Sequence, residues 1–216
     1  MADGSLLSND ARLRLKARFV PLALALARLG FTANLLTIIG FGIALVAAVL
    51  AGLQWWLAAG LVSVFGALFD LFDGAVARAT GTASKFGAFL DSTLDRWGEG
   101  LLYAGIVAGC AIAGETRAAL LAVLTLNSAF MVTFTRARAE GLGLRGEVGI
   151  APRPERVAIL GLGLILAGLG GGLDATIPWL QIALGLNLVL TTITVFQRIA
   201  YVRRQAGEEQ RSIREP

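Results

Sequence analysis

Residues 70–95 read DLFDGAVARATGTASKFGAFLDSTLD and place four aspartates in a chain otherwise dominated by Leu, Ala, Val, Ile and Gly. Asp70 and Asp73 are three residues apart, and Asp91 and Asp95 are four apart, so on helices each pair shares one face. The short break between the pairs, RATGTASK, joins two apolar stretches and makes them antiparallel neighbours. The sequence therefore predicts two carboxylate pairs that meet at the same end of two adjacent helices.

The composition is typical of an integral membrane protein. Of the 216 residues, 56% are hydrophobic and only 16% are charged, whereas soluble domains carry about a quarter charged residues. Six apolar stretches, each near the length that crosses a bilayer, follow one another with short Gly- and Pro-containing breaks. They are residues 33–52, 55–76, 86–113, 117–139, 155–172 and 176–201. We therefore expect an all-α integral membrane fold with six transmembrane helices.

The positive charges indicate how these helices are oriented. If the spans alternate in direction, all 19 Lys and Arg residues except Arg117 fall on one side. The positive-inside rule places that side in the cytoplasm, together with both termini and the aspartates. We therefore expect a multi-pass protein of the cell membrane, and the net charge of +4 needs no nucleic acid partner to explain it.

The chain divides into three parts. Residues 1–30 mix basic and apolar residues at helical spacing, which predicts a cytoplasmic amphipathic helix on the membrane surface rather than a signal peptide. Residues 31–204 would form the six-helix domain, and residues 205–216 a cytoplasmic tail. The one cysteine, Cys110, lies in an apolar run, so we expect it to be a buried structural residue.

Four carboxylates that converge from two helices need a compensating positive charge. Their hard oxygen ligands suit Mg²⁺, Mn²⁺ or Ca²⁺. The chain has no histidine, so a general base near neutral pH must be a carboxylate, a lysine or a water. A single intramembrane aspartate could instead pair with an arginine or serve an ion pathway. A divalent-cation transporter is therefore the alternative from another functional class, although the first, third and fourth spans offer almost no polar path to the outer side.

The pattern Asp-x2-Asp-Gly-x2-Ala-Arg-x8-Gly-x3-Asp-x3-Asp, from Asp70 to Asp95, resembles the signature of the CDP-alcohol phosphotransferase family at every position. The resemblance extends over nearly the whole chain, because that family is built on six transmembrane helices. Its enzymes move a substituted phosphate from a CDP-alcohol to an acceptor alcohol and release CMP. Its members are commonly homodimers, so the resemblance also implies a homodimer.

The resemblance implies a role for each aspartate. Asp70, Asp73 and Asp91 would be metal ligands, and Asp95 would be the remaining ligand and the general base. Two Mg²⁺ ions, or Mn²⁺ in their place, would neutralise the diphosphate and stabilise the leaving group. The catalytic residues expected from the resemblance are therefore Asp91 and Asp95.

By the same resemblance, the nucleotide of the donor binds beside the aspartates. Asp70 contributes to this contact, Gly74 leaves space for close approach of the nucleotide, and Arg78 supplies charged donors to the diphosphate. Ser84, just before the third span, matches a hydroxyl that the family uses for nucleotide binding.

The stretch TANLLT at residues 32–37 resembles the family's motif in the first helix. In that motif, Asn34 and Thr37 contact the CDP moiety. Capping of a helix start by Thr32 or Asn34 is the alternative explanation, because both residue types are favoured at N-cap positions.

A second charged segment, RARAEGLGLRGEVGIAPRPER at residues 136–156, contains five arginines. Topology alone is one explanation for them. However, Arg136 lies at the inner end of the fourth span and Arg156 begins the fifth, so both would face the same cavity as the aspartates. Convergent guanidinium groups of this kind favour phosphate recognition.

This segment resembles the inositol-phosphate-utilising branch of the family, the phosphatidylinositol phosphate and archaetidylinositol phosphate synthases. The resemblance implies that the phosphate of the acceptor is bound by arginines of this segment and one late in the sixth span. These are Arg136, Arg153, Arg156 and Arg198.

The expected reaction is transfer of a phosphatidyl group from CDP-diacylglycerol to 1D-myo-inositol 3-phosphate. A lipid donor accounts for a site in the membrane and implies a lateral opening between spans to membrane lipids. Glycerol 3-phosphate, as in phosphatidylglycerophosphate synthase, is the alternative acceptor. Free alcohols such as serine or inositol fit less well, because they would not need so many arginines.

Overall fold

The computed structural model describes residue 21, residues 24–174 and residues 178–214. Within these residues the regular structure is entirely helical, which confirms the all-α prediction. The elements are α2 (Ala33–Gly52), α3 (Trp56–Thr80), α4 (Lys85–Ile112), α5 (Thr116–Glu140), α6 (Arg153–Leu169), the 3-10 helix η1 (Gly172–Asp174) and α7 (Trp179–Arg214). Each predicted apolar stretch corresponds to one of the six long helices.

Four of these helices, α2, α3, α5 and α7, are long and apolar enough to cross a membrane. Helix α6 has only 17 residues, and α4 carries charged side chains along its first half, among them Asp91, Arg96 and Glu99. The structure therefore supports a membrane protein with several apolar helices, whereas six spans stay a prediction.

The two ends of the chain bear on the predicted division into parts. Of the amphipathic helix predicted at residues 1–30, residues 1–20, 22 and 23 lie outside the described residues, and residues 24–28 are helical. At the other end, α7 continues without a break from the predicted domain through residues 205–214 of the predicted tail.

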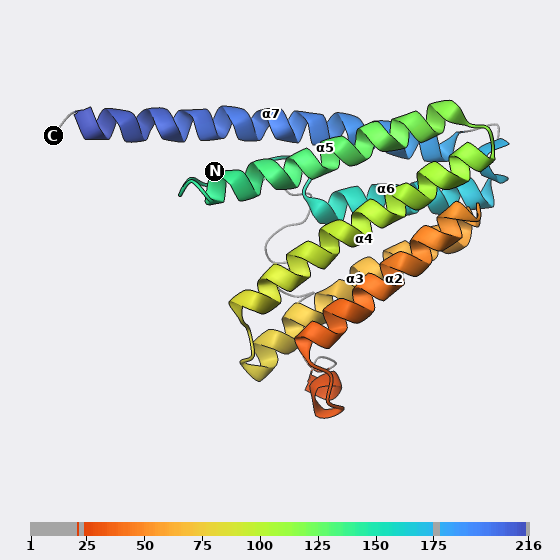
Figure 1. Cartoon of the computed structure of the whole chain (residues 1–216), viewed down its shortest axis with the longest axis horizontal. Helices are drawn as coiled ribbons and strands as arrows, with labels where there is room; N and C mark the ends of the chain where they lie inside the picture. Colours follow the sequence, from red (N-terminus) through yellow and green to blue (C-terminus); the bar gives the residue numbers. More distant parts are fainter. Residues whose placement is uncertain (1–20, 22–23, 175–177, 215–216) are drawn as a thin grey trace.

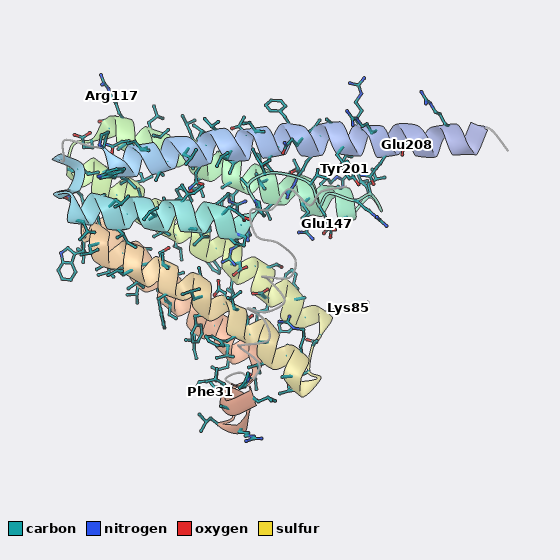
Figure 2. The ribbon with its side chains drawn as sticks, turned by 180° about the vertical axis from the view of Figure 1, so that it is seen from behind. Phe31, Lys85, Arg117, Glu147, Tyr201 and Glu208 are labelled. Carbon is teal, nitrogen blue, oxygen red and sulfur yellow. The ribbon has the colours of Figure 1, made fainter. Side chains whose placement is uncertain are left out.

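The helices form two arms that converge at one end of the molecule (Figure 1). Helices α2, α3 and α4 make one arm, α5 and α7 make the other, and α6 lies between them. Helix α6 packs on both α3 and α7, and α4 packs on both α2 and α5. The arms diverge toward the α3–α4 turn and the α5–α6 loop. Figure 2 shows Lys85 and Glu147 at this divergent end and Arg117 at the convergent end.

Small residues let α2 and α4 approach each other closely. A Cβ atom at Gly105 would overlap the carbonyl oxygen of Ala48, and one at Gly109 would overlap that of Ala51. Ala48 and Ala51 are themselves buried. Close backbone contact through small residues is the usual way in which helices associate in lipid.

Polar side chains hold α7 against α5. The Thr125 hydroxyl donates to the carbonyl oxygen of Leu184 at 3.1 Å, and the Thr191 hydroxyl donates to Ser128 Oγ at 2.8 Å. Because buried polar groups need partners, these bonds fix the register of the two helices. Cys110 is fully buried in the core formed by the converging helices, as predicted.

The outward faces of the helices are apolar. On α3, for example, Leu61, Phe65 and Leu68 are more than half exposed. Soluble monomers rarely leave large continuous apolar surfaces uncovered, whereas the acyl chains of a bilayer would cover such a surface.

We expect Gly105→Leu to lower the thermal unfolding midpoint of the detergent-purified protein, because the added side chain would push α4 away from α2. Overpacking of this kind costs about 1–3 kcal/mol. Gly42→Leu on α2 is the control, because no atom lies within 4 Å of a Cβ built there. Both substitutions remove a helical glycine, so equal midpoints would contradict the importance of the close contact.

Candidate active site

The four aspartates lie at the divergent end, on either side of the α3–α4 turn. Gly81 ends α3 in the left-handed conformation, with φ of 67°, which favours glycine. Ser84 begins α4 and its hydroxyl oxygen accepts a hydrogen bond from the Gly87 amide at 3.0 Å. Helices α3 and α4 run in opposite directions from this turn, but each packs on α2 and they do not pack on each other. The predicted pairing of these two helices as direct neighbours is therefore wrong, because α2 lies against both.

The carboxylates interact electrostatically across the two helices. Asp91 on α4 acts on both Asp70 and Asp73 on α3, and Asp70 acts on Asp95. In the described part of the chain, however, no three acidic side chains come close enough together to hold a metal ion. The four charges share one region without forming a closed ligand cage.

Asp73 is held by two neutral donors. The Thr37 hydroxyl, on α2, donates to Asp73 Oδ2 at 3.0 Å, and the Gly74 amide donates to Asp73 Oδ1. Asp73 is 7% exposed and Thr37 is 8% exposed. Thr37 thereby connects the predicted first-helix motif to the aspartate signature.

Arg153, the first residue of α6, bridges two of the remaining three aspartates, Asp70 and Asp95. Its Nη2 lies 3.0 Å from Asp70 Oδ2 and its Nη1 lies 2.6 Å from Asp95 Oδ2. One guanidinium group therefore joins α3, α4 and α6. The sequence predicted a role for Arg153 in binding phosphate and gave no sign of this bridge.

Two charged residues that the sequence interpretation missed extend this cluster along α4. Arg96 lies 3.9 Å from Asp95 and 2.9 Å from Glu99, and Glu99 accepts from Arg156 through both carboxylate oxygens, at 3.1 and 3.2 Å. Arg96 also donates to the Thr133 hydroxyl on α5 at 2.9 Å. The spacing held a signal for Glu99, because it is four residues after Asp95 and continues the same helical face.

The resulting chain of charges alternates in sign. Its members are, in order, Asp70, Arg153, Asp95, Arg96, Glu99 and Arg156. Alternation of this kind lets several charges lie partly out of water, since each one has an opposite charge beside it.

The predicted donor-binding residues lie in two groups beside the α3–α4 turn. A Cβ built at Gly74 would be 3.1 Å from Arg78 Nη1, so the guanidinium lies directly over the glycine. A Cβ built at Gly87 would be 3.2 Å from both Asn34 Oδ1 and Ser84 Oγ. The structure thus brings Asn34 on α2 next to Ser84 at the start of α4.

The capping explanation for the first-helix motif holds for one residue only. Thr32 is the N-cap of α2, and its hydroxyl oxygen accepts from the Leu35 amide at 3.2 Å. Asn34 lies inside the first turn of α2, beyond the N-cap position. Capping of α2 therefore does not explain why the Asn34 side chain lies near Ser84 and Gly87.

The four predicted acceptor-binding arginines differ in how they are used. The Arg136 side chain is 48% exposed and pairs with Glu140 and Glu147, whereas the Arg156 side chain is 3% exposed and pairs with Glu99. Arg198 on α7 is buried, and it donates to the carbonyl oxygens of Val148 and Val132.

Helix α7 fastens the α5–α6 loop through its backbone. Besides Arg198, the Gln205 side chain donates to the Arg145 carbonyl oxygen at 2.7 Å and accepts from the Arg145 amide at 3.0 Å. Further along, the Thr194 hydroxyl accepts from the Ala151 amide at 3.1 Å. The sequence did not indicate Thr194 or Gln205, because side chains that hold a distant backbone leave no local pattern.

Two small cavities adjoin the bridging arginine. One, of about 40 Å³, is lined by residues that include Thr37, Asp70, Asp95 and Arg153. The other, of about 60 Å³, is lined by Asp70, Arg153 and Arg156 among others. Each is large enough for a water or an ion, and each has charged walls.

The donor atoms are of the type that binds a hard divalent cation, although no three acidic groups of the described residues converge on one point. The smaller cavity offers carboxylate and hydroxyl oxygens, and the aspartates supply no nitrogen or sulfur ligand. Oxygen-only ligand sets of this kind suit Mg²⁺, Mn²⁺ or Ca²⁺.

The chain matches the model of the CDP-alcohol phosphatidyltransferase family over residues 31–193. It belongs to this family and is therefore an enzyme that transfers a substituted phosphate group from a CDP-alcohol. The resemblance carried by the aspartate signature is thereby confirmed.

Two relatives with assigned activities cover most of this chain. The phosphatidylinositol phosphate synthase of Mycolicibacterium smegmatis is 37% identical over 192 residues, which are 87% of this chain and 84% of that protein. The archaetidylinositol phosphate synthase of Pyrococcus horikoshii is 39% identical over 182 residues, which are 83% of this chain and 88% of that protein. Both belong to the branch that the arginine-rich segment resembles.

A solved structure has the same fold. The phosphatidylinositol phosphate synthase of Mycobacterium tuberculosis, crystallised with CDP-DAG bound, superimposes with a TM-score of 0.78 at 32% identity, covering 85% of this chain and 92% of that one. The same protein has also been crystallised in complex with manganese and citrate. A divalent metal is thus present in a structural neighbour of this chain.

We expect Glu99→Gln to destabilise the protein strongly, because it leaves the buried Arg156 guanidinium without its carboxylate. Breaking a buried ion pair from one side costs about 3 kcal/mol or more. Glu140→Gln is the matched control, because its pair with Arg136 is about half exposed and such pairs contribute roughly 1 kcal/mol or less. Thermal unfolding midpoints in detergent compare the two, and an equal loss would show that the Glu99 pair carries no special weight.

Proposed function

We propose that this enzyme transfers a phosphatidyl group from CDP-diacylglycerol to 1D-myo-inositol 3-phosphate, giving phosphatidylinositol phosphate and CMP. The observation that carries the proposal is the contact between the acidic and basic halves of the site. Arg153, from the arginine-rich segment, touches Asp70 and Asp95 of the family signature directly. A donor diphosphate held at the aspartates and an acceptor phosphate held at the arginines would therefore meet.

The donor would bind at the α3–α4 turn. Arg78 over Gly74 supplies charged hydrogen-bond donors for the diphosphate, and Asn34 and Ser84 supply polar groups for the nucleotide. Thr37 is connected to this region by its hydrogen bond to Asp73. The acyl chains of the lipid would stay against the apolar outer faces of the helices, among the membrane lipids.

The chemistry would take place at the aspartates. When bound, two divalent cations, Mg²⁺ or Mn²⁺, would neutralise the diphosphate and the charge that develops on CMP. Asp70, Asp73 and Asp91 would hold them, with Asp95 as the fourth ligand. Asp95 would accept the proton of the acceptor hydroxyl. The oxygen of that hydroxyl would form a bond to the phosphatidyl phosphorus, and the bond from that phosphorus to the CMP oxygen would break.

The acceptor phosphate would bind on the side of α5, α6 and α7. The side chains of Arg136 and Arg153 are partly exposed there, at 48% and 29%. Arg156 and Arg198 would close the pocket from inside, where both are already engaged by Glu99 and by backbone carbonyls. Arginine suits this role because its planar fork matches phosphate oxygens.

The charge distribution supports a cytoplasmic site. With the arginines facing the cytoplasm, both termini and the divergent end of the helices lie on that side of the cell membrane. A water-soluble acceptor could then reach the site directly. The proposal includes a homodimer, as expected from the family resemblance.

A CMP-release assay on the purified enzyme with CDP-diacylglycerol and Mg²⁺ tests the function. We expect release with 1D-myo-inositol 3-phosphate and little with glycerol 3-phosphate, free inositol or serine. Asp95→Asn is expected to release no CMP, and Glu115→Gln, at the convergent end, serves as its control. Release with glycerol 3-phosphate and none with inositol phosphate would instead make the chain a phosphatidylglycerophosphate synthase.

We expect Arg136→Ala to raise the KM for inositol phosphate about tenfold or more, because loss of a charge-assisted contact worth roughly 1.5–3 kcal/mol weakens acceptor binding. The KM for CDP-diacylglycerol should change little. Arg138→Ala is the matched control, because Arg138 is also exposed and lies on the same helix. If both KM values rise together, the Arg136 guanidinium does not recognise the acceptor selectively.

A further inference from the structure

Arg153 occupies one oxygen of each of two aspartates that the proposed function assigns as metal ligands. Its two terminal nitrogens point at one Oδ2 atom each, on Asp70 and Asp95. These two aspartates come from different helices, so a single guanidinium spans the site. Asp73, by contrast, is held by a hydroxyl and an amide, and Asp91 has no ion-pair partner within the described residues.

An oxygen that accepts from Arg153 cannot point the same lone pair at a metal ion. The guanidinium also adds a positive charge where a divalent cation would bind, which opposes binding through direct repulsion. Arg153 cannot remove this charge by losing a proton, because arginine stays protonated in proteins. Each carboxylate keeps a second oxygen, so the bridge and the metal compete through charge and through the shared Oδ2 atoms, and binding of one weakens binding of the other.

We propose that Arg153 is an internal counter-cation that competes with divalent metal for Asp70 and Asp95, and that metal binding releases its guanidinium to the acceptor phosphate. The proposal rests on the proposed function for the assignment of these aspartates as ligands. It gives Arg153 two successive partners of the same chemical type, first carboxylate and then phosphate.

Three features support this exchange. Arg153 Nε is buried and has no hydrogen-bond partner in the part of the chain that is described, so the bridging arrangement leaves one of its donors unused. Cavities border the guanidinium on the side of Thr37 and on the side of Arg156, so there is space beside it. Arg153 also interacts electrostatically with Glu99, which would keep a negative group near the guanidinium after it leaves Asp70 and Asp95.

The exchange couples the two halves of the site. If metal binding frees Arg153 for phosphate, then metal raises the affinity for the acceptor, and the acceptor raises the affinity for metal by the same factor. Acceptor would bind weakly until the metal site is filled. This order would keep the reactive centre from assembling around acceptor alone.

Titration of the purified full chain with Mn²⁺, followed by the electron paramagnetic resonance signal of the free ion, tests the competition. We expect Arg153→Gln to lower the Mn²⁺ concentration at half-saturation about tenfold, because the competing charge is lost. Arg117→Gln removes the same charge at the opposite end of the molecule (Figure 2) and should leave the titration unchanged. An unchanged or weaker Mn²⁺ affinity in Arg153→Gln overturns the proposal, since a guanidinium that merely oriented the carboxylates would give that result.

Arg153→Lys provides a second variant if Arg153→Gln does not fold. Lysine keeps the charge but lacks the fork that spans two carboxylates, so we expect a smaller shift in the same direction. Calorimetric titration with inositol 3-phosphate should show tighter binding with Mn²⁺ than without, and this difference should vanish in Arg153→Gln. Binding that is equally tight with and without Mn²⁺ in the wild-type protein overturns the coupling.

The outcomes separate this proposal from the proposed function. If the Asp70→Asn and Asp73→Asn variants bind Mn²⁺ as tightly as the wild-type protein, the assignment of the aspartates as ligands fails. If those variants lose Mn²⁺ while Arg153→Gln gains nothing, the assignment stands and only the competition fails.

Discussion

The arrangement of the divergent end depends on how the mutual repulsion of four carboxylates is balanced. The α3–α4 turn and the packing of α3 and α4 on α2 bring these charges into one region, where Arg96 of α4 lies 3.9 Å from Asp95. The rest of the balance comes from α6, whose first turn sends Arg153 to Asp70 and Asp95 and Arg156 to Glu99. The position of α6 between the two arms is thus tied to the acidic site as well as to apolar packing on α3 and α7.

The helices were predictable because their signals are local. Apolar stretches bounded by glycine and proline gave each of the six long helices, with ends close to those observed, and the spacing of the aspartates gave their common faces. The number of helices that cross the membrane was less predictable, since α4 carries Asp91, Asp95, Arg96 and Glu99 before its apolar second half. Part of the predicted interfacial helix, including Arg12 to Arg18, lies outside the described residues.

The contacts within the site were less predictable, because they join residues far apart in sequence. The sequence indicated Arg153 as a topology signal or a phosphate ligand, and only the packing of α6 against α3 shows that it also pairs with Asp70. Arg198 is a similar case, since it donates to backbone carbonyls in a way that no sequence spacing encodes. Glu99 alone carried a usable signal, through its position four residues after Asp95.

The loop between α5 and α6 is held by its main chain. Gln205, Arg198 and Thr194 on α7 grip the peptide groups of Arg145, Val148 and Ala151, and none of these bonds needs a particular side chain on the loop. The path of the loop backbone therefore does not depend on these bonds involving particular loop side chains. Its exposed side chains, such as Leu142 and Arg145, could be exchanged to suit a different acceptor without loosening the loop. Gly149 and the buried Ala151 could not, since a Cβ at Gly149 would overlap Thr194. An engineer who wished to alter substrate choice would therefore begin at the exposed positions.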